Sequence, residues 1–563
     1  MTASALAGPS ATPTSRSAPP PAAPAGSPRT LLWRALRAGR RDLTLSALLF
    51  STHQLGESLV PVIVGATVGS VVLDGGPARL ALYLALLAAD FLLLSLSYRF
   101  GARAAVRARR HTEHRVRMAL TERVLRPAGG VRLPPGDLLS RASGDAERVG
   151  TFAGTLATTV AAVVVLLGSA ALLLRISAVL GALVVAGTAV LLLAQSRLAR
   201  LLRRAGTAEQ ARQARATALA EDLVRGLRVV QGIGAEHTVA ADYARVSRSA
   251  VRAARRAMSA EAALIAVGTV LTGLYLAAVA AVGAWLALDG RIGLGQLIAV
   301  LGLARFVIGP MRTLSSAHAR LARALGSAAR VHEVLTTPPA VPDDGRAEPA
   351  ATAGRIEFRD VLLADGTRAD WTLPAARMTG LVCEDPATAD AVASLLARES
   401  DPETGRILLD GTALAGLPLD RLRADVLVCH HEPVLLPGTV ADNLGALTED
   451  GPAVSEAARA SFCDQVVDAA PHGAATPVGD RGETLSGGQR QRIALGRALA
   501  ARPPVLVLHD PTTAVDAVTE DAIADRVRRS RAGRTTLVIT AAPAWLARCD
   551  QVVRVPAART VTR

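Results

Sequence analysis

LSGGQRQR, at residues 485–492, runs directly into the alanine-rich segment IALGRALA at 493–500. A serine followed by two glycines at the start of a helix leaves backbone N–H groups exposed at the positive end of the helix dipole. The stretch therefore predicts a helix whose N-terminus binds an anion such as a phosphate group. From residue 354 to 563, short β-type runs alternate with helical ones, which indicates an α/β nucleotide-binding domain around this helix.

Three short motifs in this domain carry a family resemblance. LSGGQ resembles the signature motif of ATP-binding-cassette (ABC) transporters, TTAVD at 512–516 resembles their dimer-contacting loop, and TPVGDRG at 476–482 resembles the segment that contacts intracellular helices. In that family the signature motif caps the γ-phosphate of ATP held by the opposing domain of a dimer. The resemblance gives this role to Leu485, Ser486, Gly487, Gly488, Gln489 and Asp516.

Six long apolar stretches precede the cassette, most of them near the ~20 residues that a helix needs to cross a bilayer. They lie at 43–73, 80–98, 153–174, 177–194, 262–288 and 292–312. The fold class expected is multidomain: an all-α transmembrane domain of six helices over 29–334, then the α/β P-loop-type domain. A Pro- and Asp-rich linker is predicted at 335–353, a disordered tail at 1–28 and a short interfacial helix at 31–37.

The arginines of the membrane domain are unevenly distributed between its connections. The long connections at 99–150 and 197–256 carry 12 and 13 arginines, whereas those at 74–79, 175–176 and 289–291 hold one each. The positive-inside rule then places the N-terminus, both long connections and the cassette in the cytosol of a multi-pass protein of the cytoplasmic (inner) membrane. Charge in this position is juxtamembrane, so a nucleic-acid partner is not expected.

Each long connection also carries a short motif of its own. GDLLSR at 136–141 resembles the first intracellular turn of ABC exporters, and GLRVVQ at 226–231 resembles the second. With the six spans and the cassette, the resemblance covers about 30–563. It implies an exporter-type half-transporter, in which a membrane domain is fused to an ATP-binding cassette.

The phosphate-binding loop expected after the strand at 378–382 departs from the family pattern. In G-x-x-x-x-G-K-[ST], backbone N–H groups and the lysine bind phosphates, and the hydroxyl binds Mg²⁺. Here Ala389 stands at the lysine position and Asp390 at the hydroxyl position, and the chain contains no lysine at all. Losing a charge-assisted hydrogen bond (about 1.5–3 kcal/mol) and adding a carboxylate (~4 kcal/mol of repulsion at 4 Å) predicts poor ATP binding.

Other positions of this chain's own ATP site depart from the family as well. The adenine-stacking aromatic residue is replaced within 363–365, and the family's remaining site positions are occupied by His431, His509, Asp510 and Ala541. Asp510 falls at the position of the catalytic base, one methylene short, and is predicted to be inactive. His509 is a poor partner for Mg²⁺, which prefers oxygen ligands. Without a spaced His/Cys cluster, no metal site is predicted at these histidines.

Three ionisable residues lie inside the predicted spans: Glu57 in the first, Asp90 in the second and Arg305 in the sixth. Charged groups at this depth are costly and often line a transport pathway. An interhelical pair, or a group near the membrane interface, is the alternative that the sequence leaves open.

These patterns predict the degenerate half of a heterodimeric ABC exporter. ATP and Mg²⁺ are expected to be held mainly by the partner, a second half-transporter, whose site this chain completes with LSGGQ. This chain alone is not expected to hydrolyse ATP. The substrate, a small molecule, a peptide or a lipid, is not specified by the sequence, and export is the family default. The alternative is a non-transporting membrane scaffold or regulator with a vestigial cassette.

Overall fold

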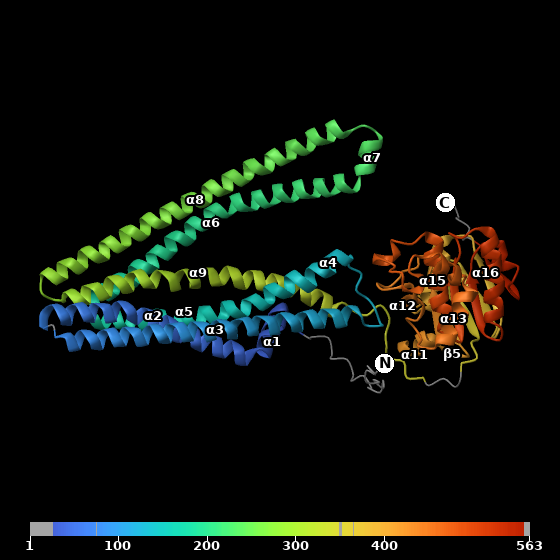
Figure 1. The fold of residues 1–563 in the computed structure, drawn as a ribbon, viewed down its shortest axis with the longest axis horizontal. Coiled ribbons are helices and arrows are strands. Elements are labelled where there is room, and N and C mark those ends of the chain that lie inside the picture. Colours follow the sequence, from blue (N-terminus) through green and yellow to red (C-terminus); the bar gives the residue numbers. More distant parts are fainter. Residues whose placement is uncertain (1–25, 75, 348–351, 364, 557–563) are drawn as a thin grey trace, which may run out of the picture. The chain divides into compact units, whose positions relative to one another are not determined.

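The computed structural model describes residues 26–74, 76–347, 352–363 and 365–556, which fall into two compact units (Figure 1). The first unit is helical and comprises the chain up to Thr121 together with Leu133–Thr336. The second contains the sheets and comprises Glu122–Arg132 and the chain from Thr337 onward. Most of the predicted tail, residues 1–25, lies outside the described residues.

The helical unit confirms the prediction of six membrane spans. Its helices are α1 (Pro28–Ala38), α2 (Arg40–Asp74), α3 (Pro77–Val124), α4 (Pro135–Ser140), α5 (Ala146–Ile176), α6 (Ala178–Arg225), α7 (Leu227–Gly232), α8 (Glu236–Leu288) and α9 (Leu294–Thr336). Among the described residues, six of them are long and apolar enough to cross a membrane. The 48 residues of α3 span roughly 72 Å, more than twice the hydrocarbon thickness of a bilayer, so much of this helix extends beyond it.

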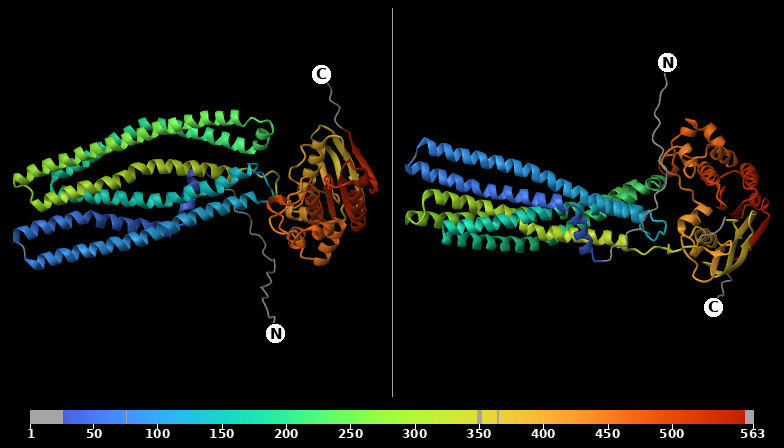
Figure 2. Two further views of the ribbon diagram at one scale, coloured as in Figure 1. Left: turned by 45° about the horizontal axis from the view of Figure 1, so that its top comes forward. Right: turned by 90° about the horizontal axis from the view of Figure 1, so that it is seen from below.

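Three short helices lie at segments that the sequence singled out: one was predicted as a helix, and the other two were identified as motifs of intracellular turns. The segment at 31–37 lies in α1, whose Leu32 and Leu36 are buried. The motif at 136–141 forms α4, and the motif at 226–231 forms α7. Helix α7 joins α6 to α8, which lie side by side and diverge from the other helices of the unit toward their α7 ends (Figures 1 and 2).

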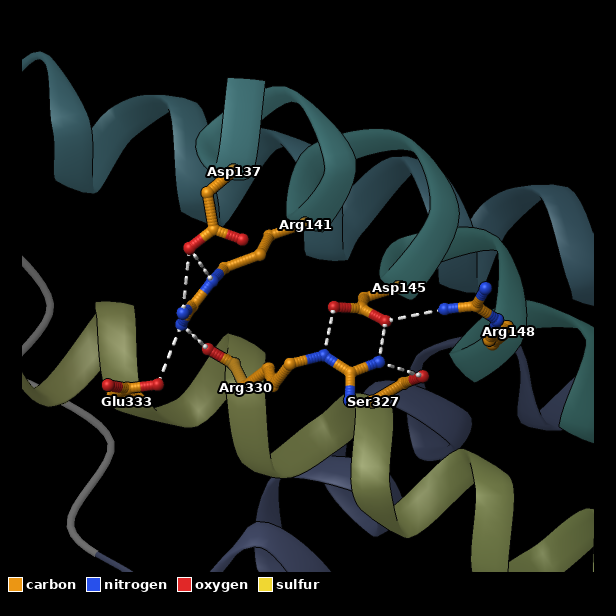
Figure 3. A network of polar contacts seen from close by, with 7 residues as sticks. All are labelled: Asp137, Arg141, Asp145, Arg148, Ser327, Arg330 and Glu333. Carbon is orange, nitrogen blue, oxygen red and sulfur yellow. Dashed lines mark hydrogen bonds and ion pairs between the residues drawn. The ribbon is translucent and has the colours of Figure 1, made fainter. Parts of the chain in front are cut away.

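A polar network ties the first of these motifs to α9 (Figure 3). We call it the α4–α9 network; its members are Asp137, Arg141, Asp145, Arg148, Ser327, Arg330 and Glu333. Arg330 binds Asp145 through both oxygens, with Nε donating at 2.8 Å. The Asp145 side chain is only 3% exposed, and a buried carboxylate needs such partners. The network spans the short π-helical stretch Arg141–Asp145, an irregularity often found at functional positions.

Two predicted boundaries need correction. Helix α9 continues to Thr336, into the linker predicted at 335–353, and ends where prolines 338 and 339 prevent further helix. Residues 122–132, which were assigned to the membrane domain, group with the second unit. The reason is a contact remote in sequence, because the Arg123 guanidinium donates hydrogen bonds to the carbonyls of Gly129, Thr337 and Pro338.

The second unit is the predicted α/β domain. Its strands are β1 (Ile356–Leu362), β2 (Arg368–Leu373), β3 (Met378–Cys383), β4 (Arg406–Leu409), β5 (Thr412–Ala413), β6 (Val426–Cys429), β7 (Val505–His509), β8 (Thr535–Ile539) and β9 (Gln551–Val555). Its helices are α10 (Pro386–Leu396), α11 (Leu419–Asp425), α12 (Val440–Leu444), α13 (Gly451–Ala460), α14 (Cys463–Ala469), α15 (Gly487–Ala500), α16 (Ala517–Ser530) and α17 (Pro543–Leu546).

The described strands form a parallel sheet, ordered β6-β7-β8-β3-β9, and an antiparallel sheet, ordered β2-β1-β4-β5. Every residue of β7 and β8 is buried, as expected of apolar strands covered on both faces. The carboxyl ends of parallel strands meet at one edge of the sheet, which is where α/β folds bind ligands. The loops after β3 and β7 therefore share that edge. The predicted fold class is confirmed.

Candidate functional site

The signature motif forms the N-terminus of α15, where Ser486 is exposed, Gly487 is half-buried and Gly488 is buried. Ser486 caps this helix in a reciprocal arrangement: its N–H donates to Gln489 Oε1 at 2.8 Å, and the Gln489 N–H donates to Ser486 Oγ at 3.3 Å. Within the described residues, the N–H groups of Gly487 and Gly488 donate to no acceptor. Two free donors at the end of a long helix are available to an anion.

Gly488 also has a packing role that the sequence did not reveal. A Cβ at this position would lie 2.6 Å from the carbonyl oxygen of Ala514, whereas a Cβ at Gly487 would lie 3.1 Å from the Ala514 methyl group. Contact with the loop at 512–516 therefore requires glycine at 488 even without a phosphate nearby. Gly487 is the better indicator of a close approach by a ligand.

Gly488→Ala is expected to destabilise the cassette by about 1–3 kcal/mol, because backbone must move to relieve the clash with Ala514. Gly487→Ala should have a smaller effect, since a methyl group can give way more easily than a carbonyl. Thermal unfolding of the full chain in detergent measures both. Equal destabilisation by the two substitutions would contradict this account of the packing.

A buried glutamine holds the loop at 512–516 against α15. The Gln491 amide nitrogen donates to Thr513 Oγ1 at 2.8 Å, and its oxygen accepts from the Ala514 N–H at 2.9 Å. Asp516 caps α16 by accepting from the Thr519 N–H at 3.0 Å, a hydrogen bond that lowers the pKa of Asp516. The signature motif and this loop thus form one continuous surface. Gln491 was not identified from the sequence, although a glutamine on the apolar face of a helix is a usable signal.

The N-terminus of α10, where the phosphate loop should be, is capped by the chain itself. The Asp385 carboxylate accepts from the Ala387 N–H at 3.3 Å and from the Thr388 hydroxyl at 3.2 Å. The N–H groups of Thr388 and Ala389 both bond to the Asp385 carbonyl, and Pro386 has no N–H. A phosphate bound here would have to displace the Asp385 carboxylate from these donors. The negative charges of the phosphate and the carboxylate would then repel each other. Asp385 was not identified from the sequence, although Asp before Pro at a helix start is a capping pattern.

The residues around this loop do not fit ATP with Mg²⁺. Ala389, at the lysine position, is buried and carries only a methyl group. Asp390, at the hydroxyl position, has a side chain that is 72% exposed and adds negative charge. Near the missing adenine-stacking residue, Asp365 accepts hydrogen bonds from Thr367, while residue 364 lies outside the described part of the chain.

The structure brings Asp390, His431 and His509 together. His509 is buried at the end of β7, with Nδ1 3.5 Å from Asp390 Oδ1 and its ring centroid 5.7 Å from that of His431. Burial lowers the pKa of His509. The neighbouring His430 pairs with Glu399 at 3.3 Å, and this hydrogen bond raises the pKa of His430. Across the described ranges, no group of three or more His, Cys, Asp or Glu residues is arranged to hold a metal ion.

These opposite shifts predict opposite pH effects on stability. Because the folded pKa of His509 lies below its usual value, acid protonates the unfolded chain first, and stability falls as the pH drops below about 6.5. His509→Gln should therefore lose less stability than wild type between about pH 7 and pH 5. His430 contributes stability below about pH 6.5 that is lost as the pH rises through its folded pKa, so His430→Gln should have a small effect of the opposite sign. Parallel pH–stability curves for His509→Gln and wild type would refute the first prediction.

At the base position, the Asp510 carboxylate accepts a hydrogen bond from Thr540 Oγ1 at 2.7 Å. Its backbone has φ +44°, a left-handed conformation that Asp tolerates better than most residues. Ala541 follows Thr540 and is exposed, with only a methyl group where the family has a histidine. The Asp510 carboxylate is therefore hydrogen-bonded to Thr540. The histidine that the family has at position 541 is absent from this site.

Two of the three candidate residues in the spans share a cavity. It has a volume of about 1060 Å³ between α2, α3 and α9, and Glu57 and Arg305 both line it. Among the described residues neither makes an ion pair, so the interhelical pair considered from the sequence does not form between them. Asp90 is buried against Gly56 and does not belong to the cavity lining.

Comparisons with known proteins identify the family of both regions of the chain. Family models described as ABC transporter transmembrane region and ABC transporter match residues 43–311 and 367–513. A multidrug efflux ATP-binding/permease protein of Mycobacterium tuberculosis is 29% identical over 476 residues, 82% of this chain and 39% of the relative. An ATP-dependent lipid A-core flippase of Alkalilimnicola ehrlichii is 31% identical over 362 residues, 61% of this chain and 60% of the relative. The chain thus matches 39% to 60% of the length of these two relatives.

Proposed function

This chain belongs to the ABC transporters, with a multi-pass membrane region fused to an ATP-binding cassette, and on that premise we propose that it is one half of a heterodimeric exporter. It moves a substrate across the cytoplasmic membrane together with a second half-transporter. In this complex it is the degenerate subunit, which completes the partner's ATP site with its own signature motif.

The contrast between two helix N-termini in one cassette supports this assignment most strongly. At α15, the N–H groups of Gly487 and Gly488 have no acceptor among the described residues; Ser486 beside them is exposed, whereas Gly487 is half-buried and Gly488 is buried. At α10, the corresponding donors are engaged by Asp385. The helix N-terminus that would bind ATP held by another chain thus has free N–H donors. The helix N-terminus that would bind this chain's own ATP has its donors already engaged.

The partner is proposed to hold ATP and Mg²⁺, whose hydrolysis supplies the energy for transport. This chain's residues orient the phosphate end: Ser486 and the glycine N–H groups face it as donors, and Asp516 lies on the adjoining loop. Asp510 is proposed not to act as a base. A homodimer would contain two signature motifs with free glycine N–H groups and two phosphate loops whose N–H groups are engaged by Asp385. Neither of its sites would hydrolyse ATP.

The membrane cavity with Glu57 and Arg305 is the proposed substrate pathway. Its wall combines these charges with apolar side chains such as Phe91 and Phe306, which fits a substrate that has both polar and apolar groups. Relatives are named for drug efflux and for flipping lipid A-core. The arginine-rich connections support a cytosolic position of the cassette.

Purification of the chain alone and with a neighbouring half-transporter tests the proposal. The chain alone should show no ATPase activity above background, and the complex should be active. Robust activity of the chain alone would contradict a degenerate site. A stable complex without substrate-stimulated activity would favour the non-transporting scaffold.

A further inference from the structure

Three arginines surround a second cavity, between α5 and α9, that the transport proposal does not use. The cavity has a volume of about 440 Å³ and is lined by Glu147, Arg148, Thr151, Phe152, Thr155, Arg320, Arg323 and Ala324. Its floor is buried, formed by Phe152, Thr155 and Ala324, whereas the charged side chains stand at its exposed rim. The result is a small pocket of mixed polar and apolar lining with a basic entrance.

The positive charge at this rim is only partly neutralised by the protein. Glu147 also lines the cavity, but it is paired with Arg109 at 2.6 Å. Arg148 donates one hydrogen bond to Asp145, at 2.9 Å, and Asp145 is itself bound by Arg330. Over the described ranges, Arg320 and Arg323 have neither an ion pair nor a hydrogen bond. Three guanidinium groups around one small cavity repel each other unless an anion lies between them.

The position along the helices indicates where that anion comes from. Phe152 and Thr155 lie at the start of the apolar stretch at 153–174, and Arg320 follows the apolar stretch ending at 312 by about 12 Å of helix rise. Phe152 and Thr155 therefore lie near the level at which a bilayer changes from acyl chains to headgroups, and the arginine side chains, which start beyond it, can reach back toward that level. On the orientation proposed above, it is the cytoplasmic leaflet.

We propose that this cavity binds the phosphate headgroup of an anionic membrane phospholipid, with Arg148, Arg320 and Arg323 around the phosphate and the lipid chain against Phe152. Arginine forms bidentate hydrogen bonds to phosphate oxygens, and basic pockets between membrane helices are suited to anionic headgroups. The site is separate from the cavity that contains Glu57 and Arg305. Its occupancy does not depend on transport.

Native mass spectrometry of the full chain in detergent, titrated with phosphatidylglycerol or phosphatidylcholine, tests this site. Wild type should retain phosphatidylglycerol preferentially. The double variant Arg320→Gln/Arg323→Gln should bind it about thirtyfold more weakly, since each arginine near a membrane surface contributes about a factor of five. The matched control is Arg252→Gln/Arg256→Gln, which removes two exposed arginines of α8 at a similar distance from an apolar stretch.

Equal weakening in the two double variants, or equal retention of both lipids by wild type, would overturn the proposal. Arg320→Lys/Arg323→Lys keeps the charge and should keep most of the binding, which separates the site from a folding defect. Displacement of the lipid by millimolar inorganic phosphate would show that the site also takes soluble phosphate, and resistance to it would restrict the site to lipid. Loss of complex formation with the second half-transporter, at unchanged lipid binding, would assign the arginines to the subunit interface instead.

Discussion

Ser486→Asp is expected to lower the ATPase activity of the complex by at least about a hundredfold, because repulsion of roughly 4 kcal/mol at 4 Å corresponds to more than two factors of ten. Aspartate caps a helix as well as serine does, so α15 should keep its structure. The added carboxylate would stand at the exposed N-terminus proposed to face the partner's ATP. Steady-state ATPase assays on the purified complex provide the measurement.

Ser486→Asn is the matched control, because asparagine caps equally well and carries no charge. Most of the activity should remain. An equal loss in both variants would show that cap geometry matters rather than charge at the phosphate. Full activity of Ser486→Asp in an intact complex would rule out a shared site and favour the scaffold.

Arg330→Ala is expected to destabilise the helical unit by about 2 kcal/mol. This is less than the roughly 3–5 kcal/mol typical of removing one partner from a buried salt bridge. The Asp145 side chain is only 3% exposed and would keep Arg148 as its remaining arginine partner, at 2.9 Å. Arg330 itself is 48% exposed, which further reduces the loss. Thermal unfolding in detergent, followed by loss of helix signal, measures the change.

The exposed ion pair between Arg245 and Asp242 offers a control within the same unit. Their side chains are 72% and 60% exposed, so Arg245→Ala should cost less than about 0.5 kcal/mol. Similar losses in Arg330→Ala and Arg245→Ala would mean that the α4–α9 network adds no more stability than a surface pair.

The features that could be predicted from the sequence are those specified by neighbouring residues. Apolar runs of the length of a bilayer specify the six spans, and apolar runs bounded by turn residues specify β7 and β8. The cap at Ser486 is likewise local, since serine, two glycines and glutamine are consecutive. The six spans and the helix that begins after Ser486 appear in the structure at or near the predicted residues.

The features that could not be predicted depend on contacts between distant residues. Arg330 and Asp145 are 185 positions apart, and nothing in either segment indicates the pairing. The packing requirement at Gly488 comes from the carbonyl of Ala514. Asp385 is a different case, because aspartate before proline at the start of a helix is a local capping pattern that the sequence contains.

The most direct test of the central claim is the number of ATP-analogue molecules bound per complex, measured with a non-hydrolysable analogue at saturating concentration. One tightly bound molecule per heterodimer, lost on Ser486→Asp, is the predicted result. Two tightly bound molecules, or one that remains bound in Ser486→Asp, would contradict a single site completed by this chain.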